Sequence, residues 1–457
     1  MSHVTLSFLG VQPIHIESDL YLELISKKIN LQKLREISVP NSSKWLDRFI
    51  HNYDVYEDIY EIQLPKIEAD LKKDFYRSFH PVNNQHITLE LSKYLTSNSV
   101  TLYFDPRFVY FILIYQINFE IPVEVLENFL DYEAHQNNDN NQDLYNTIRD
   151  VFVKDSENHK MGAWGIEAQS KTLETIKHTL NEIYSVNISE KDVSIPVSSC
   201  NISNIVLAKE HINNKNFIKK LIDLNIFAEK LTSNNDIVPL YNGTVYFSFH
   251  GRFHTIILKN ESDLYRFQSL QFHIQYMWFL VERYNKIMSR INSNLMEADS
   301  RKNIQKFTSV IHTMINKIEF LRLHDMNFKH AIEIDIDIYE RNEKKWSISK
   351  LLDSAKEYVT FFKDYLERLF NQKNALFQKK LNFILVAISF MQLLALVSVW
   401  NDYLSTVNAS NLNVDKRIIH IFGNDVSSLL SFNIYVPLIL LILMIGISLY
   451  LWKSKRE

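Results

Sequence analysis

Two places in the sequence combine residue types that could contact an anionic or aromatic ligand. His250 and His254 flank a predicted hairpin turn that contains Arg252, and together these side chains could bind an anionic ligand. Trp164 lies between two nearby glycines and could stack on a nucleobase, as aromatic side chains do in single-strand binding proteins. The simpler interpretations are a solvated turn for the first group and a packed tryptophan in a structural turn for the second. Both simpler interpretations are favoured.

A third place could bind a metal ion. Asp335 and Asp337 alternate with isoleucines, which puts both carboxylates on one face of an extended segment. Clustered carboxylates at a subunit boundary could hold Mg²⁺ or Ca²⁺. A half-buried edge strand with a solvated acidic face explains the same pattern and is favoured.

The remaining composition argues against enzymatic chemistry. Seven glycines in 457 residues form neither a GxGxxG nor a GxxxxGK[ST] motif, so the glycine-rich phosphate loops are excluded. No HExxH, Ser/His/Asp or paired-carboxylate motif has usable spacing. A net charge of −3 does not predict direct binding of nucleic acid, and the single Cys200 fits a reducing compartment. We therefore expect a protein that is not an enzyme.

The elements that would position these residues fall into two halves. Residues 1–260 have the short apolar runs and turn residues of a mixed α+β domain. Residues 252–422 contain neither glycine nor proline, which favours a few very long helices. We expect a layer of long helices over 261–345 and a stalk helix over 346–380. Phe108–Phe119 is apolar but short and rich in β-branched and aromatic residues, and this predicts a buried strand.

Two segments near the end are predicted to cross a membrane. Residues 381–400 and 434–452 carry no charge, and about 20 apolar residues span a hydrocarbon core of about 30 Å. A buried core helix is the alternative. Lysine and arginine lie just before the first segment and just after the second, but they are sparse in the loop at 401–433. Both termini and the basic tail at 453–457 are therefore expected in the cytoplasm.

The first of these spans carries its polar residues, except Ser398, on one face. Steps of three and four residues select a set that we call the polar stripe, which could line a pore if several copies surround an axis. Hydrogen bonding between packed helices explains the same stripe, and the two interpretations are evenly balanced. The residues of the stripe are Asn382, Leu385, Ser389, Gln392, Leu396 and Val399.

This order of elements resembles the CorA family of divalent-cation channels. The resemblance implies an α+β cytosolic domain, a continuous stalk helix, two C-terminal transmembrane helices and a homopentamer in the bacterial inner membrane. The family keeps Gly-Met-Asn at the outer end of the first span, where this chain has Val399, Trp400 and Asn401. Only Asn401 matches, as a contact to a hydrated ion at the pore mouth, so magnesium selectivity is put in doubt.

The resemblance leaves three functions to weigh. CorA-like proteins without the motif are membrane effectors of antiviral type III CRISPR systems, which implies a nucleotide-type second messenger acting on the cytosolic domain. We favour this function over a magnesium or other divalent-cation transporter. A non-conducting anchor for a cytosolic binding module is the third. The expected partners are membrane lipid, further copies of the chain and a small-molecule or ion ligand, and no resident cofactor is required.

Overall fold

The chain forms two compact units, Met1–Lys363 and Asp364–Glu457. The computed structural model describes most of the first unit and, of the second, mainly one helix. The described residues are 2–39, 58–75, 91–128, 161–189, 191–196, 201–223, 237–240, 245–250, 253–297, 301–331, 339–340, 343–344, 346–409, 439 and 442.

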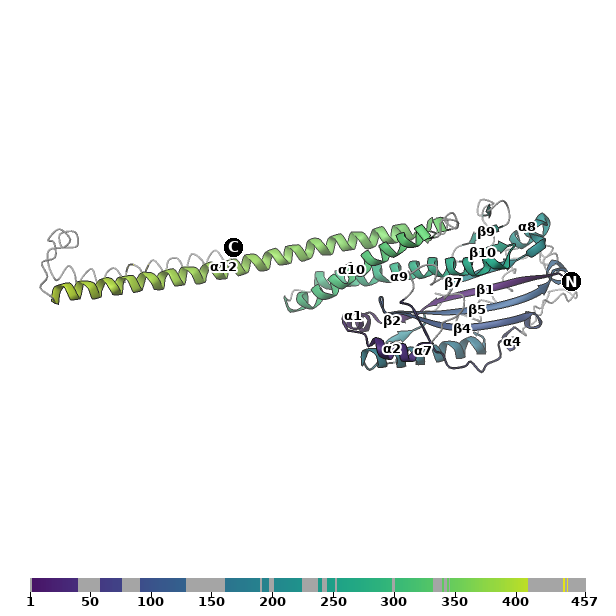
Figure 1. Ribbon diagram of the computed structural model, residues 1–457, viewed down its shortest axis with the longest axis horizontal. Coiled ribbons are helices and arrows are strands. Elements are labelled where there is room, and N and C mark those ends of the chain that lie inside the picture. The colour runs from purple at the N-terminus through teal and green to yellow at the C-terminus, as the bar shows by residue number, and fades with distance from the viewer. Residues whose placement is uncertain are drawn as a thin grey trace. The chain divides into compact units, whose positions relative to one another are not determined.

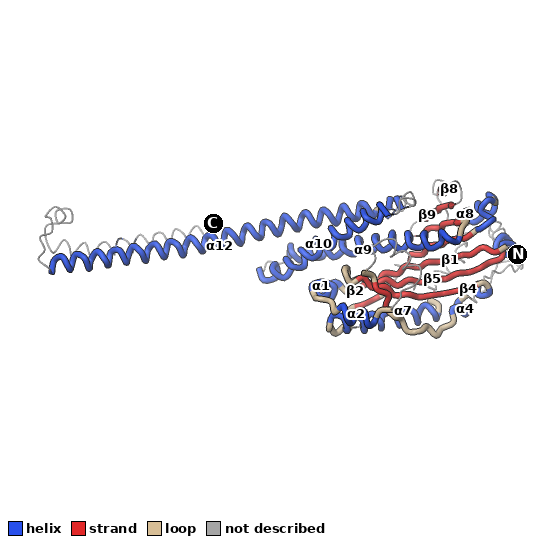
Figure 2. The backbone as a smooth tube through the Cα atoms, in the orientation of Figure 1, coloured by secondary structure: helices blue, strands red, loops and turns tan. Residues whose placement is uncertain are grey.

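A mixed eight-stranded sheet forms the centre of the first unit (Figure 2). Its strand order is β3-β4-β5-β1-β7-β10-β9-β8, and β10 runs parallel to β7 while the other neighbours are antiparallel. The strands are β1 (His3–Pro13), β3 (Tyr60–Ile62), β4 (Leu95–Asp105), β5 (Tyr110–Pro122), β7 (Asn201–Leu207), β8 (Ile237–Leu240), β9 (Val245–His250) and β10 (Phe253–Leu258). A separate two-stranded sheet pairs β2 (His15–Ile16) with β6 (Val193–Ser194).

Helices cover both faces of this sheet (Figure 1). Figure 1 shows α9 and α10 along one side and α2 and α7 along the other. The α-helices are α1 (Ser18–Ser26), α2 (Leu31–Ile37), α4 (Leu71–Asp74), α7 (Ala163–Tyr184), α8 (Lys215–Asp223), α9 (Leu264–Glu297), α10 (Arg301–Ala331) and α12 (Ile348–Ala409). Short 3₁₀ turns cover Leu91–Lys93, Lys209–Asn213 and Glu261–Asp263.

The double cover explains the sequence of β5. Tyr110 packs against Tyr276 of α9, and Tyr115 packs against Trp164 of α7. The two tyrosines are five positions apart and therefore face opposite sides of the sheet. A strand with both faces buried reads as a continuous apolar run rather than as an alternation, which is why Phe108–Phe119 shows no period of two.

The start of α7 is fixed by a side chain from a different helix. The carboxylate of Asp74 accepts hydrogen bonds from the amides of Ala163 and Trp164, both at 3.0 Å. These are two of the amide groups that a helix leaves unbonded at its N-terminus. Gly162 is the N-cap, and a Cβ at this position would collide with the carboxylate of Asp74. Glycine therefore leaves room for the capping carboxylate, which any larger residue would displace.

α12 is one unbroken helix of 62 residues, about 90 Å long at 1.5 Å per residue. Its first turns pack on the first unit, because Ala355, Val359 and Phe362 are buried at spacings of four and three. The continuous helix predicted from 346 through 400 is present. The predicted α+β region and the long apolar C-terminal helix are thus confirmed. The second predicted span, at 434–452, lies outside the described residues except for Ile439 and Ile442.

Candidate functional site

The C-terminal part of α12 is the one helix among the described residues that is long and apolar enough to cross a membrane. The candidate segment is Ile348–Val399, whose most apolar 18-residue window has a mean hydropathy of 2.2 and no buried residue. This assignment rests on length and composition. Exposed large apolar side chains are normally avoided on soluble proteins, and here they follow one another along the helix, as at Phe383, Met391 and Leu396.

All six residues of the polar stripe are exposed on α12. The side chains of Phe390, Leu394 and Val397 are half-buried instead. At 100° per residue, the half-buried side chains are centred roughly 140° around the helix axis from the stripe. The polar stripe therefore lies on the side of α12 away from its better-packed face. Asn401 lies in α12 as well, but its side chain is outside the described part of the chain.

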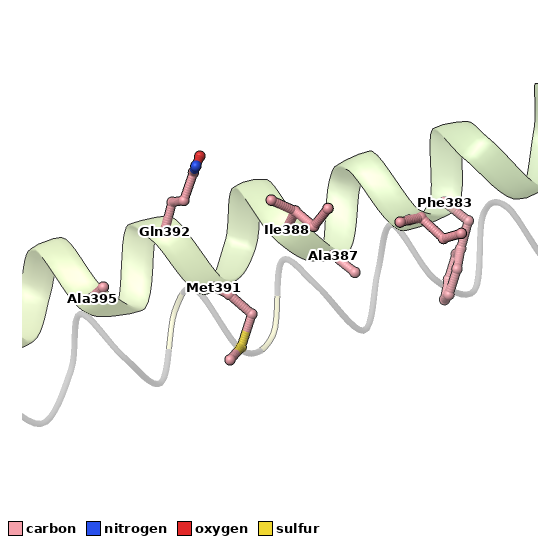
Figure 3. A pocket seen from close by; sticks show the side chains of 7 residues that line it. Phe383, Ala387, Ile388, Met391, Gln392 and Ala395 are labelled. Carbon is pink, nitrogen blue, oxygen red and sulfur yellow. The ribbon is translucent and has the colours of Figure 1, made fainter.

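An apolar hollow of about 420 Å³ lies beside the stripe on α12. Its lining includes the small side chains of Ala387 and Ala395 and the larger side chains of Phe383 and Met391. Figure 3 shows Gln392 projecting from the opposite side of the helix to Phe383 and Met391. Gln392 is the one polar residue among those that line the hollow.

The predicted ligand contacts in the first unit are dispersed. His250 is the last residue of β9 and pairs with Phe253, and His254 in β10 pairs with Phe249. Arg252 and the side chains of both histidines lie outside the described part of the chain. Trp164 is 4% exposed in α7, where its ring packs on Tyr115. The tryptophan is packed as the simpler interpretation predicts, but it lies in the first turn of α7 rather than in the predicted structural turn. The anion site at the hairpin stays a prediction.

The predicted metal ligands Asp335 and Asp337 lie outside the described residues. Among the residues that are described, no group of three or more His, Cys, Asp or Glu side chains is arranged to hold a metal ion.

Sequence reasoning missed a buried ionic group where the β4–β5 turn enters the helical layer. The Asp105 carboxylate is 2% exposed, and the guanidinium of Arg107 donates to its oxygens at 3.0 and 2.8 Å. The hydroxyl of Tyr276 on α9 donates to Oδ2 at 2.5 Å. On α10, the pKa of Lys317 is lowered to about 8, because burial and the charge of Arg107 together outweigh the raising effect of Asp105. The charged side chains of Asp105 and Arg107 in this turn therefore interact with residues of both α9 and α10.

Aromatic packing holds the same turn in place. Arg107 lies 5.5 Å from the ring centre of Phe320, and Phe108 packs on Tyr284 and Phe320 at 6.0 and 5.9 Å. The next residue, Val109, has a φ of 50°, a left-handed backbone that is strained for a β-branched residue. Such strain persists where surrounding packing enforces it. The turn is therefore a rigid contact between the sheet and the two long helices.

A second polar group, centred on the buried Asp325 and Tyr339, connects α10 to the start of α12, and we call it the clasp. Asp325 accepts a hydrogen bond from the hydroxyl of Tyr339 and lies 3.0 Å from Nζ of Lys329. The same Nζ lies 2.8 Å from Glu343, which accepts a hydrogen bond from Ser349 at 2.6 Å. These five residues form one chain of contacts from α10, through the segment that follows it, to the first turn of α12. The spacing of four between Asp325 and Lys329 was visible in the sequence, but the partners beyond it were not.

Two histidines lie next to the clasp. Burial lowers the pKa of His273 on α9 to about 4, although nearby Asp325 opposes the shift. Burial, together with the charge of His273, lowers the pKa of His324 to about 2. Burial raises the pKa of Asp325, but the nearby His273, 4.0 Å away, the hydrogen bond from Tyr339 and the charge of Lys329 outweigh burial and hold this pKa at about 2. At neutral pH the ionised Asp325 of the clasp therefore lies beside two neutral imidazoles.

Further contacts fasten the beginning of α12 to α9. Trp346 packs edge-on against Trp278 at 5.5 Å, and the side-chain amide of Asn285 donates to the carbonyl oxygen of Leu351 at 2.9 Å. A cavity of about 450 Å³ lies beside the clasp and is lined by Arg322 from α10 and by Lys356 from α12. Any shift between α9, α10 and this segment would therefore act directly on the start of α12.

No protein-family model, no curated protein and no solved structure matches this chain. Its function must therefore be argued from its own residues.

Proposed function

We propose that the chain is an oligomeric ion channel in which the polar stripe of α12 faces the pore. The observation that carries the proposal is the exposed stripe itself. Asn382, Ser389 and Gln392 would be costly against lipid, because their amide and hydroxyl groups have no water there to bond. Around an axis they form polar rings, while Leu385 and Leu396 form constrictions that can close by dewetting.

The proposed channel has two spans per chain, with both termini in the cytoplasm. The second span is the apolar segment 434–452, which would lie toward lipid. We assign the first unit the role of controlling the pore. The support is the clasp, which joins α10 to the first turn of the same helix that carries the stripe.

Among channels, we propose one of the CorA type that has lost the family's usual selectivity. Val399 and Trp400 stand where the family has Gly-Met, so the pore mouth lacks two of the three groups that hold a hydrated magnesium ion in that family. This difference favours a channel that opens when a ligand binds the first unit, as in the antiviral effectors, over a housekeeping transporter. Growth rescue of a magnesium-transport-deficient strain would instead favour the transporter.

Planar-bilayer recording tests the channel directly. The purified chain should conduct, and Asn382→Leu or Gln392→Leu should change the single-channel conductance because each removes a polar ring. Met391→Leu is the matched control, because Met391 is 67% exposed on α12 but lies outside the stripe. If the stripe only joins helices, the two stripe variants will change the oligomeric state and leave conductance per channel unchanged. A chain that never conducts would be a membrane anchor.

A further inference from the structure

The helix segment that enters the apolar part of α12 carries unbalanced positive charge. Residues 368–401 contain no Asp or Glu. Lys373, Lys379 and Lys380 therefore have no carboxylate three or four positions away, the spacing at which helical ion pairs form. All three side chains are exposed, and within the described part of the chain no ion pair engages them.

Apolar side chains accompany these lysines. Phe377 is 63% exposed and Leu376 is 43% exposed, in the turn between Lys373 and the lysine pair. We call Lys373, Leu376, Phe377, Lys379 and Lys380 the basic collar. Its cations and its apolar groups are both turned to the surroundings of the helix, which suits an interface that offers negative charge next to hydrocarbon.

The position of the collar along α12 matches such an interface. The uncharged run begins at Leu381, so the collar lies about 2 to 12 Å below it at 1.5 Å per residue. The headgroup layer of a bilayer is about 5 to 7 Å thick on each side of the core. Lys379, Lys380 and Phe377 fall within this layer. Lys373 lies beyond it but within a Debye length of about 8 Å, and its side chain can reach back.

We infer that the basic collar binds the headgroups of anionic phospholipids. The inference rests on the part of the proposed function that has α12 crossing the membrane. Charge decides which partner fits the basic collar. The collar of a second α12 would repel it, because both carry positive lysines, whereas a lipid phosphodiester neutralises these lysines. Each lysine near an anionic surface strengthens binding by about fivefold at low salt.

Spin-labelled lipids measure this preference on the whole chain. The protein is reconstituted in phosphatidylcholine vesicles, and electron paramagnetic resonance gives the association of spin-labelled phosphatidylglycerol relative to labelled phosphatidylcholine. The wild-type chain should prefer phosphatidylglycerol by about fivefold or more. The triple variant Lys373→Gln, Lys379→Gln, Lys380→Gln should lose most of that preference, and so should the wild type in 1 M salt, where charges are screened beyond about 3 Å.

The matched control removes three lysines from the first unit. Lys28, Lys350 and Lys356 are also exposed, and replacing them with glutamine changes the net charge by the same amount. This control should keep the wild-type lipid preference. An unchanged preference in the collar variant, no preference in the wild type, or a changed oligomeric mass in the collar variant would each overturn the inference.

Failure of the proposed function gives different results. A chain that does not float with vesicles overturns the spanning helix and the collar together. A chain that floats and prefers phosphatidylglycerol but never conducts overturns the channel and leaves the collar standing.

Discussion

Asp105 and Asp325 are buried carboxylates, and each is surrounded by donors from more than one element. Asp105 in the β4–β5 turn contacts Arg107 and Tyr276, and Asp325 on α10 contacts Lys329 and Tyr339. A buried charge left without its partner is costly, so such groups tie the relative positions of the elements that supply their donors. The two carboxylates therefore fix the positions of the neighbouring elements as well as contributing to stability.

Replacing Asp105 tests this at the turn. Asp105→Asn removes the negative charge that faces Arg107, whose side chain is only 19% exposed, and should lower the free energy of unfolding by about 3 to 5 kcal/mol. Asp58→Asn is the control, because that carboxylate is 62% exposed and 3.9 Å from Arg107, and should cost about 0 to 1 kcal/mol. Chemical denaturation of the full chain in detergent measures both. Equal losses in the two variants would contradict the assignment.

His273 gives a pH dependence with a defined sign. Burial lowers its pKa to about 4 from an ordinary 6.5, so between these values the unfolded state binds more protons than the folded state. The stability from neutral His273 is complete above pH 6.5 and is lost as pH falls toward 4, up to roughly 3 kcal/mol. His273→Gln should reduce the fall in melting temperature over this window without abolishing it, because burial also lowers the pKa of the neighbouring His324, to about 2, and His324 loses stability over the same range.

The pH range between 6.5 and 4 distinguishes the titration of His273 from that of its neighbour Asp325. With a pKa of about 2 against an ordinary 3.8, Asp325 loses its contribution only at lower pH. His312→Gln is the matched control, since His312 is exposed on α10. A melting temperature that varies with pH between 6.5 and 4 equally in wild type and His273→Gln would refute the effect.

Among the elements, α7 depends on a capping group that is distant in sequence. Asp74→Ala leaves the amides of Ala163 and Trp164 without their acceptor and should cost about 1 kcal/mol. Gly162→Ala should cost a similar amount, because its Cβ displaces the same carboxylate. Since both act through one contact, the double variant should cost less than the sum of the two. Additive losses in thermal unfolding would show that the glycine acts independently of the cap.

Local pattern predicted the elements better than it predicted their assembly. The apolar run at Phe108–Phe119 predicted β5, the turn between His250 and His254 predicted the β9–β10 hairpin, and the absence of glycine and proline predicted the continuity of α12, because these signals lie within each segment. The strand order and the Asp74 cap join residues far apart in the chain, so no local period reveals them. The clasp was missed for a similar reason: Lys329 was visible beside Asp325, but Glu343 is brought to it by the fold.

For the molecule as a whole, α12 is the element that belongs to both units. It begins at the clasp and carries the polar stripe, and over 62 residues nothing in its sequence breaks the helix. Sharp helix kinks arise mostly at proline or at breaks in the hydrogen-bond ladder, and α12 contains neither proline nor glycine. If the first unit biases the proposed pore, the stiffness of α12 between the two must matter.

A proline in the intervening turns tests that coupling. Asn371 is exposed on α12 between the packed first turns and the apolar segment, so Asn371→Pro kinks the helix without removing a packed side chain. The single-channel conductance should stay as in the wild type, because the polar stripe is unaltered, while the open probability should change. Asn371→Ala is the control, since it removes the same side chain but keeps the helix continuous. An open probability that is identical in the proline and alanine variants would mean that the first unit does not act on the pore through α12.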